Sequence, residues 1–264
     1  MTNMMPQLIG VVHLLPLPGA PRWGGSMSAV CEHAAEDAKA FAEGGADALV
    51  IENFGDVPFT SERVPAETVA AMATVFSHLR QVAKITLPFG FNVLRNDPMS
   101  GLGLAATCGG KFIRVNVHSG TMVTDQGVIE GQAYETVRKR QVLCPKVAIW
   151  ADVHVKHAQP LGGGSLEDAA KDALHRGLAD ALIVSGVATG ESVDADDLRV
   201  VRQACPEAAI YVGSGSSVES APRLLEFADG LIVGTSVKVD GLLAQPVDPA
   251  RVQALRAAMD MERM

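Results

Sequence analysis

Several features that define whole classes of proteins are missing from this sequence of 264 residues. Aromatic residues make up only 5% of it, the four cysteines form no CxxC pair, and 22 Lys and Arg against 30 Asp and Glu leave a net charge of −8. A disulfide scaffold and a dedicated nucleic-acid-binding protein are therefore excluded, since the first needs paired cysteines and the second a cluster of basic residues. We expect reduced thiols, a cytoplasmic location and no nucleic-acid partner.

Long hydrophobic runs are also missing. Residues 1–6 carry no basic charge, and the apolar run 8–17 is too short and too interrupted by proline for a signal peptide or a membrane span. With 48% hydrophobic residues, 26 Gly and 14 Pro, the composition is that of a globular protein throughout. We therefore expect a soluble protein with no membrane span.

What the sequence does contain is a short apolar run that recurs along the chain, followed each time by a stretch of helical length. The predicted strands are 8–14, 48–51, 88–93, 112–117, 147–155, 181–184, 210–212 and 231–233. Met27–Glu43 is rich in helix-forming residues, and Pro65 suits the first turn of the next helix. Ser165, Asp194 and Ser217 stand where N-caps are expected.

An internal repeat supports this alternation of strand and helix. Gly45–Ile51 resembles Leu178–Val184 and Phe227–Val233, with Cys108–Ile113 as a looser copy, and each copy leads into an even-numbered strand. Eight strand–helix units in about 250 residues predict an α/β fold, a single (β/α)8 TIM barrel with parallel strands over residues 1–264. A doubly wound open sheet is the alternative, and it is disfavoured because no GxGxxG motif follows the first strand.

In several predicted strands, polar residues alternate with apolar ones and so occupy one face of the strand. The apolar face of a barrel strand must pack on the helices, so the polar face points into the barrel, increasingly toward its C-terminal mouth, where active sites of this fold lie. The residues expected there are His13, Glu52, Asn92, Arg114, Asn116, His118, Asp152, His154, Lys156 and Ser185. A buried ion pair, such as Arg114 with Asp152 or Glu52, is the simpler explanation for any single one of them.

Two carboxylates at the predicted mouth suggest acid–base catalysis. Glu52 and Asp152 lie on opposite strands, one as general base and the other as acid, with His154 and Lys156 tuning their protonation. The remaining polar residues would bind substrate. No organic cofactor is expected; a divalent metal held by Asp152 and His154 is an alternative, and so is a Schiff base on Lys156.

Two loops rich in glycine and serine follow the predicted seventh and eighth strands, the usual place of a phosphate site in this fold. Glycine lets the backbone approach a ligand closely, and successive N–H groups attract an anion. The predicted phosphate-binding residues are Gly213, Ser214, Gly215, Ser216, Gly234, Thr235 and Ser236. Lys238 would either add positive charge there or be a solvated loop lysine.

The segments that carry these residues resemble the motifs of a known protein family. They are 8–19 (LIGVVHLLPLPG), 52–59 (ENFGDVPF), 90–97 (GFNVLRND), 112–116 (FIRVN) and 152–157 (DVHVKH), with the closing Gly-Ser-Gly and Gly-Thr segments. Together they resemble the BtpA family, which includes SgcQ-like proteins. The resemblance implies a phosphate-binding barrel, and the family name is tied to photosystem I biogenesis, but it implies no settled reaction.

Two hypotheses of function follow. The first is an enzyme that acts on a phosphorylated sugar or nucleotide by acid–base chemistry, as a lyase, an isomerase or an enzyme of glycosidic cleavage. The alternative is a non-catalytic binding or assembly factor of the BtpA type, for which the barrel is a scaffold. The expected partner is a phosphorylated small molecule, and a homo-oligomer is compatible with the sequence.

Overall fold

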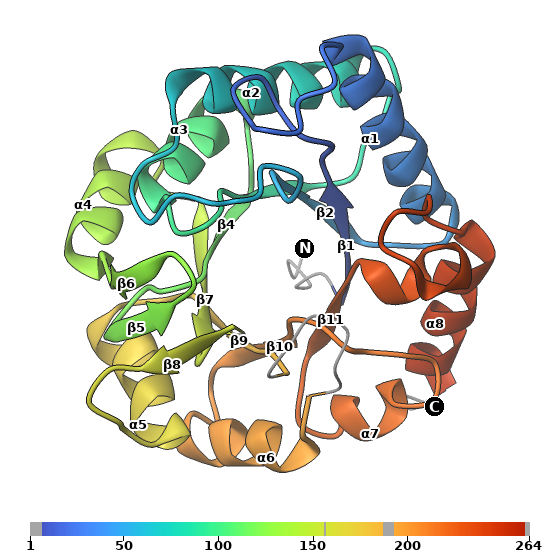
Figure 1. Ribbon diagram of the computed structural model, residues 1–264. Helices are drawn as coiled ribbons and strands as arrows, with labels where there is room; N and C mark the ends of the chain where they lie inside the picture. The colour runs from blue at the N-terminus through green and yellow to red at the C-terminus, as the bar shows by residue number, and fades with distance from the viewer. Residues whose placement is uncertain (1–6, 156, 187–192, 262–264) are drawn as a thin grey trace.

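The core of the protein is a closed barrel of parallel strands surrounded by helices (Figure 1). The computed structural model describes residues 7–155, 157–186 and 193–261. The order around the barrel is β1-β11-β10-β9-β7-β4-β3-β2. These strands are β1 (Leu8–His13), β2 (Ala48–Glu52), β3 (Phe89–Asn92), β4 (Phe112–Val115), β7 (Ala148–Val153), β9 (Ala181–Val184), β10 (Ala209–Val212) and β11 (Gly230–Val233). The predicted (β/α)8 fold is therefore confirmed.

A helix follows each barrel strand and covers its outer side (Figure 1). The helices are α1 (Met27–Glu43), α2 (Ala66–Gln81), α3 (Pro98–Cys108), α4 (Ala133–Leu143), α5 (Leu166–Lys171), α6 (Ala195–Ala204), α7 (Ala221–Leu225) and α8 (Pro249–Met261). A π-helical stretch (Asp172–Arg176) continues α5, and short 3-10 turns cover Thr235–Val237 and Val239–Gly241. Among the described helices, none combines the length and the apolar character that crossing a bilayer requires.

The helix starts follow the predicted caps with one exception. The Ser165 hydroxyl accepts a hydrogen bond from the N–H of Asp168, Asp194 caps α6, and Pro65 directly precedes α2. Ser217 was expected to cap the helix after β10, but α7 begins only after Ser220. The Ser217 hydroxyl instead accepts the N–H of Ser220 at 3.2 Å, which closes a turn ahead of the helix.

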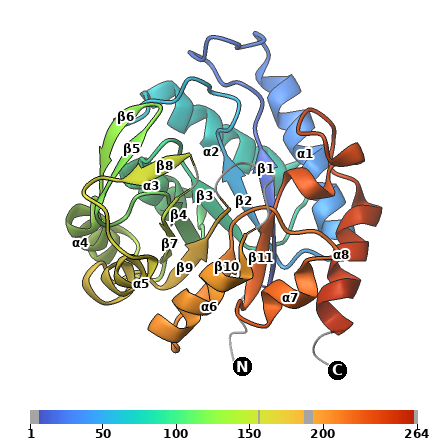
Figure 2. The same ribbon diagram turned by 60° about the horizontal axis from the view of Figure 1, so that its bottom comes forward.

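A small antiparallel sheet that the sequence did not predict lies beside the barrel mouth (Figure 2). Its order is β6-β5-β8, with β5 (Thr121–Thr124), β6 (Gly127–Glu130) and β8 (Ala158–Pro160). One face carries Met122 and Ile129, which are buried against Val117 and Val155. This satellite core holds the β5–β6 hairpin against the end of the barrel.

The barrel interior is apolar in its lower half. Ten buried residues on seven of the barrel strands form one cluster there: Ile9, Val11, Ala48, Val50, Phe112, Trp150, Ala181, Ile183, Tyr211 and Ile232. At its centre the rings of Phe112, Trp150 and Tyr211 stack, with centroid separations of 4.0 and 4.3 Å. This cluster, the barrel floor, fills the space with large side chains, so the polar inward residues can occupy only the upper part, at the mouth.

The repeated Ala-Asp pairs stabilise the opposite end of the barrel. Asp47, Asp180 and Asp229 each accept a hydrogen bond from a backbone N–H at the start of the neighbouring strand, at 2.7 to 2.9 Å. Each also pairs with an arginine of a helix, on α8, α4 and α6 respectively. The repeat is thus recurrent helix-to-strand turn chemistry, and it belongs to stability rather than to the site.

A buried ion pair joins the end of the chain to its beginning. Lys238 Nζ donates to Asp37 Oδ2 on α1 at 2.9 Å, and both side chains are at most 1% exposed. The other Asp37 oxygen accepts the N–H of Val247 at 2.8 Å, and Lys238 also donates to the Gln245 carbonyl. Lys238 is therefore neither a phosphate ligand nor a solvated loop lysine, because its charge is already paired inside the protein.

Replacing Lys238 with Met should destabilise the protein by about 3–5 kcal/mol, because it leaves the Asp37 carboxylate buried without its counter-ion. The shift of the urea unfolding midpoint measures this. The double variant with Asp37→Leu should recover part of the loss, since it removes the stranded charge. A single variant as stable as the wild type would show that the pair contributes nothing.

Candidate functional site

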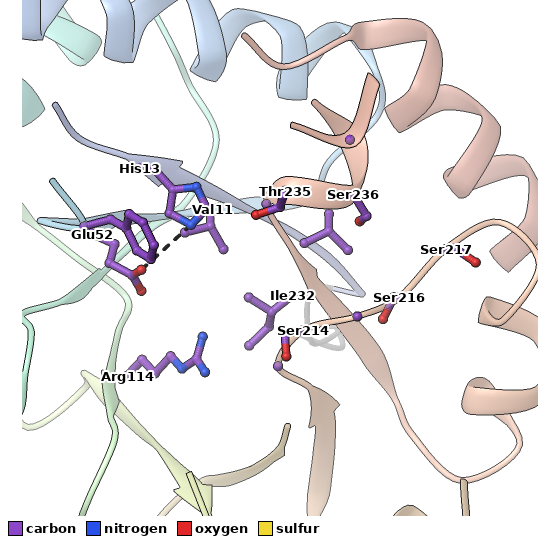
Figure 3. A pocket seen from close by; sticks show the side chains of 16 residues that line it. Val11, His13, Glu52, Arg114, Ser214, Ser216, Ser217, Ile232, Thr235 and Ser236 are labelled. Atoms are coloured by element: carbon purple, nitrogen blue, oxygen red, sulfur yellow. Dashed lines mark ion pairs between the residues drawn. The ribbon is translucent and has the colours of Figure 1, made fainter. Parts of the chain in front are cut away.

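Two adjoining cavities open at the C-terminal mouth of the barrel. The first, about 200 Å³, lies between the ends of β1, β2, β10 and β11 (Figure 3). The second, about 350 Å³, lies over β3 and β4 and reaches the β5–β6 hairpin. Glu52, Phe54 and Arg114 line both cavities, so the two form one continuous site with these residues at the junction.

Arg114 is held in place by a buried carboxylate. Its Nε and Nη2 donate to the two oxygens of Asp152 at 2.9 and 2.8 Å. Asn116 Nδ2 and Ser185 Oγ also donate to Asp152, at 3.0 and 3.2 Å. Burial alone would lower the pKa of Arg114, but the Asp152 carboxylate raises it above its ordinary value. Asp152, with its side chain fully buried, thus neutralises Arg114.

Glu52 lies at the end of β2 with its carboxylate at the junction of the cavities. Its Oε2 accepts a hydrogen bond from Asn92 Nδ2 at 2.5 Å, and its Oε1 is 3.8 Å from His13 Nε2. Figure 3 shows the His13 and Glu52 side chains pointing into the first cavity from one side, with Arg114 below them. No lysine or arginine among the described residues lies within ion-pair distance of Glu52, so Glu52 lacks the strong cationic partner that Asp152 has.

Two glycines let these side chains approach the opposite strands. A Cβ at Gly213 would lie 2.3 Å from Ser185 Oγ and 3.1 Å from Arg114 Nη2. A Cβ at Gly234 would lie 2.5 Å from the His13 ring. The contacts with Ser185 and His13 are closer than real Cβ atoms show, and the contact with Arg114 would be tight, so glycine suits both positions.

The loop Ser214–Ser216 forms the far wall of the first cavity, together with Thr235 and Ser236 (Figure 3). The backbone N–H groups of Ser214, Gly215 and Ser216 donate to no acceptor among the described residues. The hydroxyl oxygens of Ser214 and Ser216 are buried and have no partner there either. These donors line the cavity and are therefore available to a ligand that enters it.

Two of the predicted catalytic and binding residues, His118 and His154, are not brought to this site. His118 is buried away from both cavities, with Nε2 2.8 Å from the Gly177 carbonyl. His154 lines a separate cavity with Asp197, and burial lowers the pKa of its imidazole. His118 lies beyond the end of β4, and His154 follows β7 with a left-handed φ of 51°, so neither side chain continues the inward face of its strand. Lys156 lies outside the described residues.

The metal alternative required Asp152 and His154 to act together. Both Asp152 oxygens are engaged by Arg114, and His154 occupies the separate cavity. Among the described residues, no three His, Cys, Asp or Glu side chains are grouped so as to hold a metal ion. The structure therefore does not assemble the suggested pair of ligands into one site.

Several residues of the second cavity were missed by the sequence reasoning. They are Phe54, Phe59, Leu94, Arg95, Asp125, Gln126 and His157. Phe54 is also in ring contact with His13 at 4.7 Å. Phe54, Phe59 and Arg95 fall in the family-like segments 52–59 and 90–97, a signal that could have singled them out. The hairpin residues Asp125 and Gln126 carried no such signal.

Asp152→Asn should destabilise the protein by about 3–5 kcal/mol, since it leaves the buried Arg114 guanidinium without a carboxylate. Ser185→Ala is the matched control: it removes one neutral donor from the same carboxylate and should cost about 1 kcal/mol. Chemical unfolding of both variants measures the difference. If the Asn variant is as stable as the control, the ion pair between Asp152 and Arg114 does not contribute to the stability of the protein.

The comparisons with known proteins agree with this architecture. Among the solved structures, thiamine phosphate pyrophosphorylase from Pyrococcus furiosus matches with a TM-score of 0.59 at 13% identity, over 97% of this chain and 96% of that one. Phosphoribosyl anthranilate isomerase from Thermococcus kodakaraensis matches with a TM-score of 0.54 at 15% identity, over 96% and 98%. At such identities the likeness shows the fold alone.

The sequence relatives are much closer. Photosystem I biogenesis protein BtpA of Synechocystis is 46% identical over 96% of this chain and 87% of its own. The putative sgc region protein SgcQ of Escherichia coli is 33% identical over 93% and 91%. The model of the BtpA family matches residues 4–261. The chain is therefore a member of the BtpA family.

Proposed function

We propose that this protein is an enzyme that acts on a phosphorylated sugar or nucleotide by acid–base chemistry at the mouth of the barrel. One observation carries the proposal. The unpartnered donors of the loop Ser214–Ser216 face the Glu52 carboxylate across a single cavity. An anion-binding wall and a proton-accepting group thus share one small space.

The Ser214–Ser216 loop supports the phosphate part of the proposal. Consecutive backbone N–H groups form a concave site for an anion, and the two serine hydroxyls add further donors. A phosphate group would accept from all of them, which removes the cost of leaving buried donors unpaired. Two proteins of the same fold are named for phosphorylated compounds, thiamine phosphate pyrophosphorylase and phosphoribosyl anthranilate isomerase.

Glu52 is the group proposed to accept a proton from the substrate. Asn92 holds one oxygen of its carboxylate, and the other faces His13. A substrate anchored at the Ser214–Ser216 loop would extend over Glu52, and His13 would return the proton or stabilise the charge that forms. Arg114, fixed by Asp152, would stabilise negative charge from below. Isomerisation and cleavage of a sugar phosphate can both proceed with such a set of groups.

The name of the Synechocystis relative favours the second candidate, a binding or assembly factor. Such a protein needs the barrel surface, but it does not need a carboxylate beside unpartnered donors in a cavity. The two candidates therefore differ in the consequence of changing Glu52. An assembly factor would tolerate Glu52→Gln, whereas the enzyme would not.

Inorganic phosphate should raise the melting temperature by about 3–6 °C at ten times its Kd, because a ligand of the native state stabilises it by mass action. Gly215→Asp should abolish this shift by placing a carboxylate at the anion site. Gly215 has φ 74°, a region that Asp and Asn tolerate better than other side chains. Gly215→Asn is the control for size without charge and should keep a larger part of the shift. An undiminished shift in the Asp variant would remove this loop from the site.

Glu52→Gln should lower turnover by about two to four orders of magnitude while leaving the phosphate-dependent thermal shift in place. Mass spectrometry of metabolites retained by the purified protein identifies compounds to assay, and NMR of each phosphorylated compound follows its conversion. The wild type is the reference for every compound. If compounds bind but the wild type converts none of them, the result supports a binding factor and the enzymatic proposal fails.

A further inference from the structure

The second cavity contains a repeated arrangement of amides. Three side-chain amides line it, those of Asn92, Asn116 and Gln126. In each case the amide N–H donates to a carboxylate: Asn92 to Glu52, Asn116 to Asp152, and Gln126 to Asp125. A carboxylate can only accept, so these contacts fix which way each amide points.

The fixed orientation leaves the three amide oxygens without partners. Asn92 Oδ1, Asn116 Oδ1 and Gln126 Oε1 are buried and accept no hydrogen bond within the described part of the chain. Asn92 and Asn116 are 1% and 3% exposed. A buried acceptor without a donor is costly, so the occupant of this cavity should carry donors for several acceptors.

We infer that the second cavity binds the polyhydroxylated part of a sugar phosphate, and that Gln126 at the tip of the β5–β6 hairpin contributes to its selection. The inference rests on the proposed function, because the phosphate of the same molecule would occupy the Ser214–Ser216 loop. Glu52 and Arg114 line both cavities, so one ligand passes over them from the phosphate to the polyol.

The acceptors favour a sugar over a nucleobase. They come from β3, from the end of β4 and from the hairpin, so they surround the cavity from different directions. A purine or pyrimidine carries its few N–H donors along one edge of a flat ring. A sugar carries a hydroxyl on nearly every carbon, and each hydroxyl can donate. Only the sugar can therefore reach acceptors on separate walls at the same time.

The hairpin that supplies Gln126 is held firmly. The buried contacts of Met122 and Ile129 with Val117 and Val155 anchor it to the barrel. Gln126 lies in the turn between β5 and β6, and its N–H donates to Thr124 Oγ1 at 3.1 Å. The hairpin tip, which lines the second cavity, is therefore held in place, as selection by hydrogen bonding requires.

Calorimetric titration of four probes tests the inference: inorganic phosphate, AMP, ribose 5-phosphate and fructose 6-phosphate. At least one sugar phosphate should bind with a Kd about ten-fold or more below those of phosphate and AMP. Gln126→Leu should raise the Kd of that sugar phosphate about 3- to 10-fold, the effect of one lost hydrogen bond, and leave the Kd of phosphate unchanged. Gln159→Leu is the matched control, because Gln159 lies in the same small sheet but lines another cavity.

Three results would overturn the inference while phosphate still binds. AMP could bind more tightly than both sugar phosphates, Gln126→Leu could leave sugar-phosphate binding unchanged, or it could weaken phosphate and sugar phosphate equally. A wild-type protein that binds neither inorganic phosphate nor any phosphorylated probe would contradict the proposed function itself. The two failures are therefore distinguishable in one set of titrations.

Discussion

The ion pair between Arg114 and Asp152 is the interaction on which the mouth of the barrel depends. A guanidinium placed above an apolar floor of stacked rings can stay there only with a carboxylate beside it. The same carboxylate accepts from Asn116 and Ser185, so one buried charge on β7 orients side chains at the ends of β4 and β9. Arg114 then lines both cavities at the point where they adjoin. Removing this pair would release Asn116 and Ser185 from the contacts that orient them.

Much of the fold could be predicted because alternation of apolar and polar residues reports directly on strand geometry. That rule placed His13, Glu52 and Asn92 at the mouth, where the structure has them. It failed for His118 and His154, although it held for Asn116 and Ser185, which also lie beyond the last residue of their strands. His154 has φ 51°, a left-handed conformation in which the side chain leaves the strand's two faces. Beyond the end of a strand, alternation therefore predicts the direction of some side chains and not of others.

The roles of the charged residues were harder to predict than their positions. Asp152 and Glu52 are both carboxylates at strand ends, and nothing local in the sequence distinguishes them. The difference comes from partners distant in the chain, since Arg114 precedes Asp152 by 38 residues. Lys238 is a similar case, because its partner Asp37 is 201 residues away. The β5–β6–β8 sheet escaped prediction for the same reason, as β8 joins the hairpin only after helix α4 and strand β7.

The pair of Lys238 with Asp37 bears on how the chain is made. Helix α1 is translated before the lysine that pairs with its Asp37, because Lys238 lies some 200 residues later in the chain. The first strand likewise lacks its partner β11 until the same late segment emerges. A chain without β11 and Lys238 would have an unpaired edge on β1 and an uncompensated Asp37 carboxylate on an otherwise apolar face of α1. Closure of the barrel therefore removes two features that favour association with other chains, an open strand edge and a buried charge without a partner.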